Sequence, residues 1–128
     1  MKALLDTHTF IWWMSDSPSL SQTARDFIQR DEHEIFLSAA TVWELAIKAS
    51  KGRIVLPDAL ENFVSNALTY YHFSVLPIQF DHAYRVMALP NHHNDPFDRV
   101  LIAQCQCEDM VLLSADPILP NYGVRVIW

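Results

Sequence analysis

The sequence predicts an α/β fold: a three-layer α/β/α sandwich around a mainly parallel five-stranded sheet. Two observations lead to this prediction. Short, continuous apolar runs, which are typical of buried parallel strands, recur along the whole chain. Between most of them lie segments with the apolar period of a helix. Strands that alternate with helices favour parallel pairing, because each helix returns the chain to the same edge of the sheet.

The length and composition restrict the class of protein further. A chain of 128 residues is expected to form a single domain, residues 1–128, with one substantial core. The hydrophobic content of 51% argues against disorder. No apolar run is long enough to span a bilayer, and Asp6 interrupts the N-terminal one, so we expect a cytoplasmic protein. The net charge of -6 argues against a protein that binds nucleic acid over its whole surface.

The predicted strands are short apolar runs. They cover residues 2–6, 35–37, 73–76, 110–113 and 124–127. Helices are predicted between them, namely 7–14, one that begins at residue 19, one that ends at residue 52, one capped near residue 58, about 81–89, and a long buried helix after residue 95. Ser19 with Gln22, and Asp58 with Glu61, have the spacing of helix capping pairs.

Four acidic residues are predicted to meet at one edge of the sheet. Asp6 ends the first strand and Glu44 lies in the first turns after the second. Asp98 opens the long helix, and Asp116 follows the fourth strand. The carboxyl ends of parallel strands share an edge with the N-termini of helices packed antiparallel to them, and open α/β sheets bind their ligands there. We therefore expect Asp6, Glu44, Asp98 and Asp116 to form one site.

Such a cluster of like charges is costly without a cation. Two unit charges about 4 Å apart repel by on the order of 1 kcal/mol in water and about 4 kcal/mol at an effective dielectric near 20. Some of the carboxylates would therefore hold protons in the absence of metal. Oxygen ligands favour Mg²⁺ or Mn²⁺, which bind through a few carboxylates and the phosphate of a substrate. The chemistry that fits is metal-assisted hydrolysis of a phosphodiester.

These acids also have structural interpretations. Asp95 followed by Pro96 has the form of a helix N-cap with proline at the first helical position, where Asp98 would complete a capping box. Asp116 could cap a short turn. A carboxylate at the end of a central strand has little structural purpose, so Asp6 argues most strongly for function.

Glu44 has two structural interpretations of its own. It could form a capping box with Thr41, or an ion pair with Lys48 one turn on. Lys48 also belongs to the best candidate patch for a phosphate backbone, which continues with Lys51 and Arg53, although a solvated face explains these residues equally well.

The order of the acidic motifs resembles that of the PIN-domain ribonucleases, and within them the VapC-type toxins of bacterial toxin-antitoxin pairs. The matching segments cover nearly the whole chain and are LLDTH (4–8), SAATVWELAIK (38–48), DPFDRVLIAQ (95–104) and LSAD (113–116). The resemblance implies a PIN-like fold, an acidic quartet of the four residues named above around Mg²⁺ (or Mn²⁺), and endonucleolytic cleavage of RNA. It also implies a homodimer and a small antitoxin protein that blocks the site.

Several neighbouring residues are candidates for additional roles. Lys48, Arg99 and Ser114, which stands where the family often has threonine, are the candidate substrate contacts; Arg99 could instead hold a carboxylate. His92 and His93 could join the acids in a mixed site for zinc or manganese, but exposed loop positions near the active edge are the favoured interpretation.

The first predicted helix and the cysteines supply weaker signals. His8 could touch substrate, and Trp12 and Trp13 suit the core or a partner-binding groove better than a base-stacking surface. Cys105 and Cys107 suit neither a redox pair nor zinc, so we expect buried thiols.

Other classes of protein fit less well. A haloacid-dehalogenase-type phosphatase requires an aspartate two residues after the first, where this chain has His8. A receiver domain requires a paired acid on the first strand and a lysine near the last, and neither is present. The remaining alternative is a catalytically silent PIN-fold protein-binding module, against which the intact acidic quartet argues.

Overall fold

The sheet of this protein is entirely parallel. In the computed structural model, which describes residues 1–128, five strands pair in the order β3-β2-β1-β4-β5. The strands are β1 (Lys2–Leu5), β2 (Glu34–Ser38), β3 (Ser74–Leu76), β4 (Val111–Leu113) and β5 (Val126–Ile127). β1 is central because Ala3, Leu4 and Leu5 are apolar on both faces and fully buried. The predicted α/β fold with five strands is confirmed.

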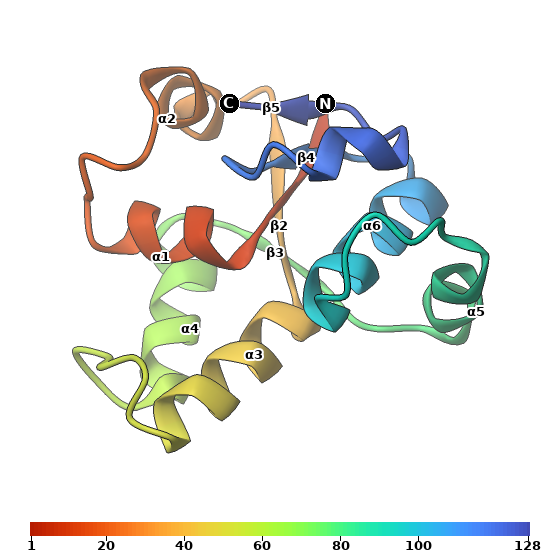
Figure 1. The fold of residues 1–128 in the computed structure, drawn as a ribbon. Coiled ribbons are helices and arrows are strands. Elements are labelled where there is room, and N and C mark those ends of the chain that lie inside the picture. The colour runs from red at the N-terminus through yellow and green to blue at the C-terminus, as the bar shows by residue number, and fades with distance from the viewer.

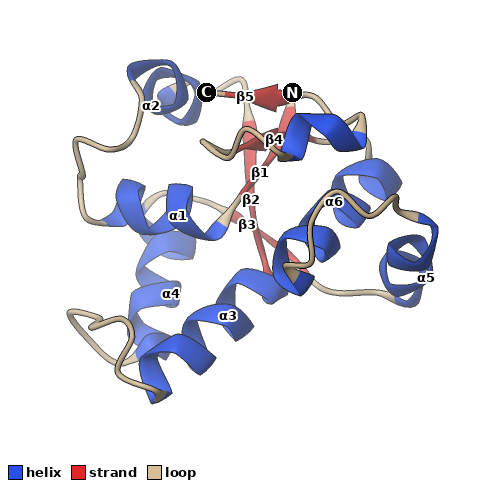
Figure 2. Ribbon diagram, viewed as in Figure 1, coloured by secondary structure: helices blue, strands red, loops and turns tan.

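Six α-helices and one short 3₁₀ helix surround the sheet. They are α1 (Thr7–Met14), α2 (Gln22–Gln29), α3 (Ala39–Ser50), α4 (Leu60–Tyr70), α5 (Phe80–Ala88), α6 (Pro96–Glu108) and η1 (Leu119–Tyr122). In Figures 1 and 2, α1, α2 and α4 lie on one side of the strands, and α5 and α6 lie on the other. None of the helices has the length and apolar character needed to span a lipid bilayer.

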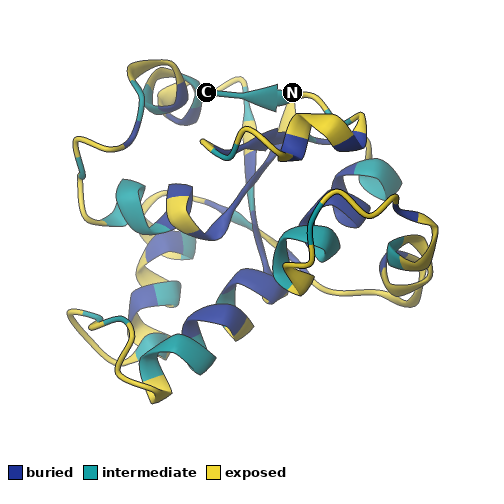
Figure 3. Ribbon diagram, in the orientation of Figure 1, coloured by how far each residue is buried: buried dark blue, intermediate teal, exposed yellow.

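Each face of the sheet carries its own apolar core. Leu4 and Leu112 point to the side of α5 and α6, where they pack with Leu101 and Ile102. Alternate strand residues point to the other side and pack with Phe10 of α1 and its neighbours. Figure 3 shows the resulting pattern, in which the central strands and the inner faces of the helices are buried. Two packed faces make the three-layer sandwich.

Two of the expected helix caps are wrong. α2 begins at Gln22 and is capped by Ser21, whose Oγ accepts the N–H of Ala24 at 3.0 Å, rather than by Ser19. α4 has Ala59 at its N-cap position and no capping side chain. Both segments contain more than one polar residue that can cap a helix, so spacing alone does not select the right one.

The cap of α3 also differs from the expected Thr41–Glu44 pair. Ser38 at the end of β2 caps this helix, because its Oγ accepts the N–H of Ala40 at 3.0 Å. α3 therefore begins directly at the carboxyl end of a strand. This early start leaves the Glu44 side chain free to point into the interior of the molecule.

The strand order creates a topological switch point between β1 and β4. From β1 the chain proceeds outward to β2 and β3, and then crosses to the other side of β1 to form β4 and β5. Loops that leave two adjacent strands in opposite directions open a crevice at their carboxyl ends. Leu5 pairs with Leu113 at this edge, so the residues that follow both strands lie beside the crevice.

Candidate active site

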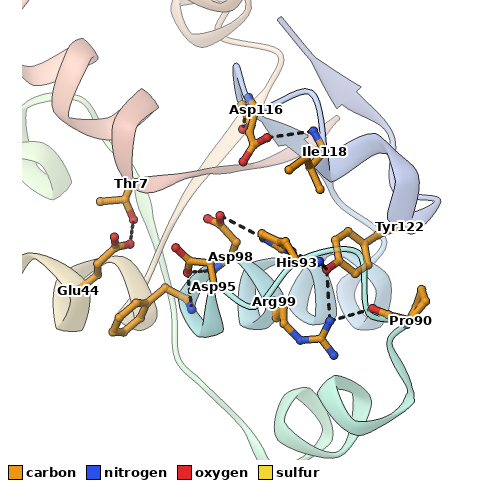
Figure 4. A network of polar contacts seen from close by, with 12 residues as sticks. Thr7, Glu44, Pro90, His93, Asp95, Asp98, Arg99, Asp116, Ile118 and Tyr122 are labelled. Carbon is orange, nitrogen blue, oxygen red and sulfur yellow. Dashed lines mark hydrogen bonds and ion pairs between the residues drawn. The ribbon is translucent and has the colours of Figure 1, made fainter.

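A cavity of about 380 Å³ lies at this crevice and contains all four predicted acids. Its lining residues are Asp6, Thr7, His8, Trp12, Glu44, Lys48, Asp95, Asp98, Ala115 and Asp116. Figure 4 shows Asp95 and Asp98 at the start of α6, with Glu44 approaching from α3 and Asp116 from the loop after β4. A larger hollow of about 550 Å³ beside the end of α4 has no acidic or histidine residue in its lining.

Asp6 connects the central strand to the first helix. It is the N-cap of α1, and its Oδ1 accepts the N–H of Thr9 at 2.8 Å. Its own N–H and the Thr9 hydroxyl both donate to the Leu113 carbonyl of β4, at 3.2 and 2.9 Å. Asp6 therefore has a structural role as the cap of α1, which the sequence did not reveal. Only one of its two carboxylate oxygens is needed for this cap.

Glu44 is buried and already has two partners. Its Oε1 accepts the Thr7 hydroxyl at 2.6 Å, and its Oε2 lies 2.6 Å from Lys48 Nζ. Of the two structural interpretations of Glu44, the ion pair with Lys48 one turn on is thus the one that the structure shows. Lys48 is the only lysine or arginine among the lining residues, so the cavity carries a strong excess of acidic groups.

Asp95 and Asp98 are fixed by the start of α6. Asp95 is the N-cap, as predicted, and its Oδ1 accepts the N–H groups of Phe97 and Asp98 at 2.9 and 3.0 Å. Pro96 occupies the first turn, where it has no N–H to leave unpaired. The N-terminal end of the helix dipole favours negative charge at both carboxylates.

Asp98 is the acid whose ionisation the fold disfavours. Burial, which is the largest cause, and repulsion from Asp95 raise its pKa from 3.8 to about 6. The hydrogen bond from His93 lowers the pKa, and repulsion from Asp6 raises it. Asp98 and Asp6 are therefore electrostatically coupled across the cavity.

A polar chain behind Asp98 was not predicted from the sequence. The backbone N–H of His93 and Nη1 of Arg99 both donate to the Tyr122 hydroxyl, at 3.3 and 3.2 Å. Because the oxygen of the Tyr122 hydroxyl accepts both of these hydrogen bonds, its own proton is donated to Nδ1 of His93. This fixes the tautomer, so that Nε2 of His93 donates to Oδ2 of Asp98 at 3.3 Å. His93 is therefore a partly buried hydrogen-bond donor to Asp98 rather than an exposed loop residue.

Two of the three candidate substrate contacts point elsewhere in this structure. The Arg99 guanidinium donates to the carbonyls of Pro90, Val86 and Leu89 at 2.8 to 3.4 Å, and so holds the C-terminal end of α5. Ser114 is buried, and its Oγ accepts the N–H of Asp116 at 3.1 Å.

The remaining acid lies on the opposite side of the switch point from Asp6. Asp116 follows β4, and its Oδ1 accepts the N–H of Ile118 at 2.9 Å, which is the turn cap anticipated from the sequence. Its other carboxylate oxygen is not needed for this cap. Among buried side-chain nitrogen and oxygen atoms, only Nε1 of Trp13 has no hydrogen-bond partner. The second carboxylate oxygens of Asp6 and Asp116 are therefore not buried without a partner.

The donor set of the cavity suits a hard divalent cation. Five carboxylates line it, and carboxylate oxygen is the ligand type that Mg²⁺ and Mn²⁺ prefer. As the side chains stand, no three acidic, histidine or cysteine residues converge closely enough to hold an ion. Glu44 is turned to Lys48 and Thr7, and Asp98 to His93, so these two side chains would have to rotate toward an ion.

The comparisons with known proteins agree with this architecture. The PIN domain model matches residues 3–124. VapBC2 from Rickettsia felis bound to a promoter DNA fragment has a TM-score of 0.72, with 10% identity over 98% of this chain and 97% of that chain. DNA-bound VapBC from Salmonella typhimurium has a TM-score of 0.70, with 18% identity over 98% of this chain and 96% of that chain. FitAcB from Neisseria gonorrhoeae has a TM-score of 0.67, with 19% identity over 97% of this chain and 95% of that chain. No curated protein sequence gave a match.

Proposed function

The chain belongs to the PIN-domain family, and on that basis we propose that it is a metal-dependent endoribonuclease and the toxin of a toxin-antitoxin pair. The observation that carries the proposal is the convergence of Asp6, Glu44, Asp98 and Asp116 on one cavity at the switch point of the sheet. The raised pKa of Asp98, which comes mainly from burial and then from repulsion by Asp95, supports it, because a bound cation would stabilise the charged form that the metal-free fold disfavours.

We assign the four acids to the metal site. When bound, Mg²⁺ or Mn²⁺ would neutralise charge on the phosphate and promote deprotonation of the attacking water. Asp6 and Asp116 each present a spare carboxylate oxygen from opposite sides of the switch point. Glu44 would contribute after rotating away from Thr7 and Lys48, and Asp98 would turn toward the ion the oxygen that His93 does not contact. His93 would keep a hydrogen bond to Asp98 and orient it.

Substrate contacts follow from the same geometry. Rotation of Glu44 toward a cation would release the Lys48 ammonium, which lies at the wall of the cavity and could then bind a phosphate oxygen of the RNA. For Arg99 and Ser114 the observed hydrogen bonds favour positioning roles over direct contact with RNA.

The proposed partner is a small antitoxin, and the proposed assembly is a homodimer. The structures that this fold resembles include VapBC proteins and, from Klebsiella pneumoniae, a toxin-antitoxin complex. An antitoxin that covers the acidic cavity would keep the nuclease inactive.

Cleavage of RNA by the purified, partner-free protein tests the proposal. We expect cutting with Mg²⁺ and with Mn²⁺, none with chelator, and a loss of at least about a hundredfold in Asp6→Asn and Asp98→Asn. Asn is a good N-cap, so Asp6→Asn should keep the start of α1 intact. Asp31→Asn, which changes an exposed acid in the turn before β2, is the matched control and should cut normally.

The alternative of a catalytically silent binding module makes the opposite predictions. The wild-type protein would then show no metal-dependent cutting, and Mg²⁺ or Mn²⁺ would leave its melting temperature unchanged, since a ligand stabilises only a protein that binds it.

A further inference from the structure

One part of the acidic cavity is lined by aromatic side chains. Trp12 on α1 and the exposed His8 one turn earlier both belong to its lining, and their ring centroids are 5.6 Å apart. The ring of Trp128 lies 5.8 Å from that of Trp12. Trp12 is only partly buried, so an aromatic surface is accessible beside the carboxylates.

The faces of the Trp12 ring have no parallel partner. His8 and Trp128 are tilted against it by 42° and 53°. Phe27 and His33 show the contrast, because their rings lie 3.8 Å apart at 3° and cover one another. Trp12 therefore has partly exposed aromatic surface at the cavity and no ring stacked on it in parallel.

We propose that Trp12, with His8 beside it, is a stacking platform for one unpaired base next to the phosphate that is cut. The inference rests on the proposed nuclease function and gives Trp12 a use that the sequence alone did not favour. A base inside a duplex is already stacked on both sides, whereas a base in a loop can be splayed onto an aromatic side chain. A cavity of about 380 Å³ is near the lower end of the range for small-ligand sites and suits one nucleotide rather than a helix.

The charges of the cavity explain why stacking is needed. Affinity for nucleic acid usually comes from lysine and arginine contacts to phosphates. Here five carboxylates line the cavity, and the single lysine is paired with Glu44 at 2.6 Å. Apart from a cation held by the acids, an aromatic surface is the main source of attraction that the cavity offers to RNA.

A combined change of enzyme and substrate tests the platform. A short single-stranded RNA is first mapped for its cleavage site, and the bases flanking that site are then removed one at a time. For the wild-type protein, we expect one abasic position to lower kcat/KM by about 5- to 100-fold, which corresponds to the loss of one base stack. For Trp12→Leu, we expect a similar loss on the intact RNA, mainly in KM, and no further loss on the abasic RNA. Trp12→Phe, which keeps a ring, should recover most of the activity.

A binding measurement and a control variant complete the experiment. In an Asp98→Asn background, uncut RNA should quench tryptophan fluorescence, and adding Trp12→Phe should abolish most of the quenching. Trp43→Leu is the control, because Trp43 is 57% exposed on α3 and lies outside the cavity lining, and it should behave as wild type.

The outcomes separate this inference from the proposed function. If metal-dependent cleavage is normal, and removal of a base lowers kcat/KM equally in wild type and in Trp12→Leu, the platform alone is overturned. A Trp12→Leu protein that handles RNA normally but no longer binds a protein partner would also overturn it, since Trp12 would then belong to a protein interface. Absence of cleavage by the wild-type protein would overturn both.

Discussion

At the scale of single residues, Asp98 shows how the fold raises the energy of a carboxylate. Burial and the neighbouring Asp95 raise its pKa from 3.8 to about 6. Between these two pH values Asp98 binds more protons in the folded protein than in the unfolded chain, so its contribution to the stability of the metal-free protein falls as the pH rises through this window. Above about pH 6 the full cost is present. Below about pH 4 the carboxyl is protonated in both states and the cost disappears.

Asp98→Asn should therefore stabilise the metal-free protein in a pH-dependent way. Asparagine keeps a hydrogen-bond acceptor for His93 and removes the charge. We expect a gain of roughly 1–2 kcal/mol at pH 7.5, which is less than the pKa shift alone would give because the group is partly solvated. Thermal unfolding with chelator at pH 7.5 and pH 4 measures it. A stabilisation of equal size at both pH values would show that the charge is not the cause.

The sequence revealed the acids at this scale, but not their partners. The position of Asp6 at the end of an apolar run and of Asp98 in a helix start could be deduced from local pattern. The chain of hydrogen bonds from Tyr122 through His93 to Asp98 joins the end of η1, a loop and the first turn of α6, and Tyr122 and His93 are 29 positions apart, so no local signal predicts it.

At the scale of elements, the start of α6 serves both the helix and the cavity. Asp95 satisfies two backbone N–H groups, and it also faces the other acids. The sequence predicted this cap because Asp followed by Pro is specific. The predicted caps of α2 and α4 were wrong, because several polar residues compete for the cap position there.

Two substitutions of Asp95 separate its roles as a cap and as an acid. Asp95→Ala should lower the free energy of unfolding by about 1 kcal/mol, because two N–H groups lose their acceptor. Asp95→Ser keeps an acceptor but removes the carboxylate, so we expect near-wild-type stability and RNA cleavage within a few-fold of wild type. Denaturant unfolding and the cleavage assay measure both. A Ser variant that is stable but inactive would make Asp95 a metal ligand.

At the scale of the whole molecule, topology produces the site. The alternation of apolar runs and helical segments sufficed to predict a parallel sheet and thus the shared carboxyl edge. The strand order could not be deduced from it, since alternation does not say on which side of β1 each later strand is added. That order is what places the loops after β1 and β4 on either side of one crevice.

The charge of the molecule predicts an unusual salt dependence for RNA binding. The chain carries 9 basic and 15 acidic residues, and only Lys48 of the basic ones lines the cavity. Each phosphate that a protein neutralises on a single strand contributes a slope of about -0.7 to the dependence of log K on log salt concentration. With one or two such contacts, affinity at fixed Mg²⁺ should fall only about 3- to 7-fold between 50 and 200 mM salt. Titration of a labelled RNA with the Asp98→Asn protein measures the slope. A loss of a hundredfold or more would mean that a basic surface outside the cavity holds the RNA, and binding would then be dominated by charge rather than by stacking and metal.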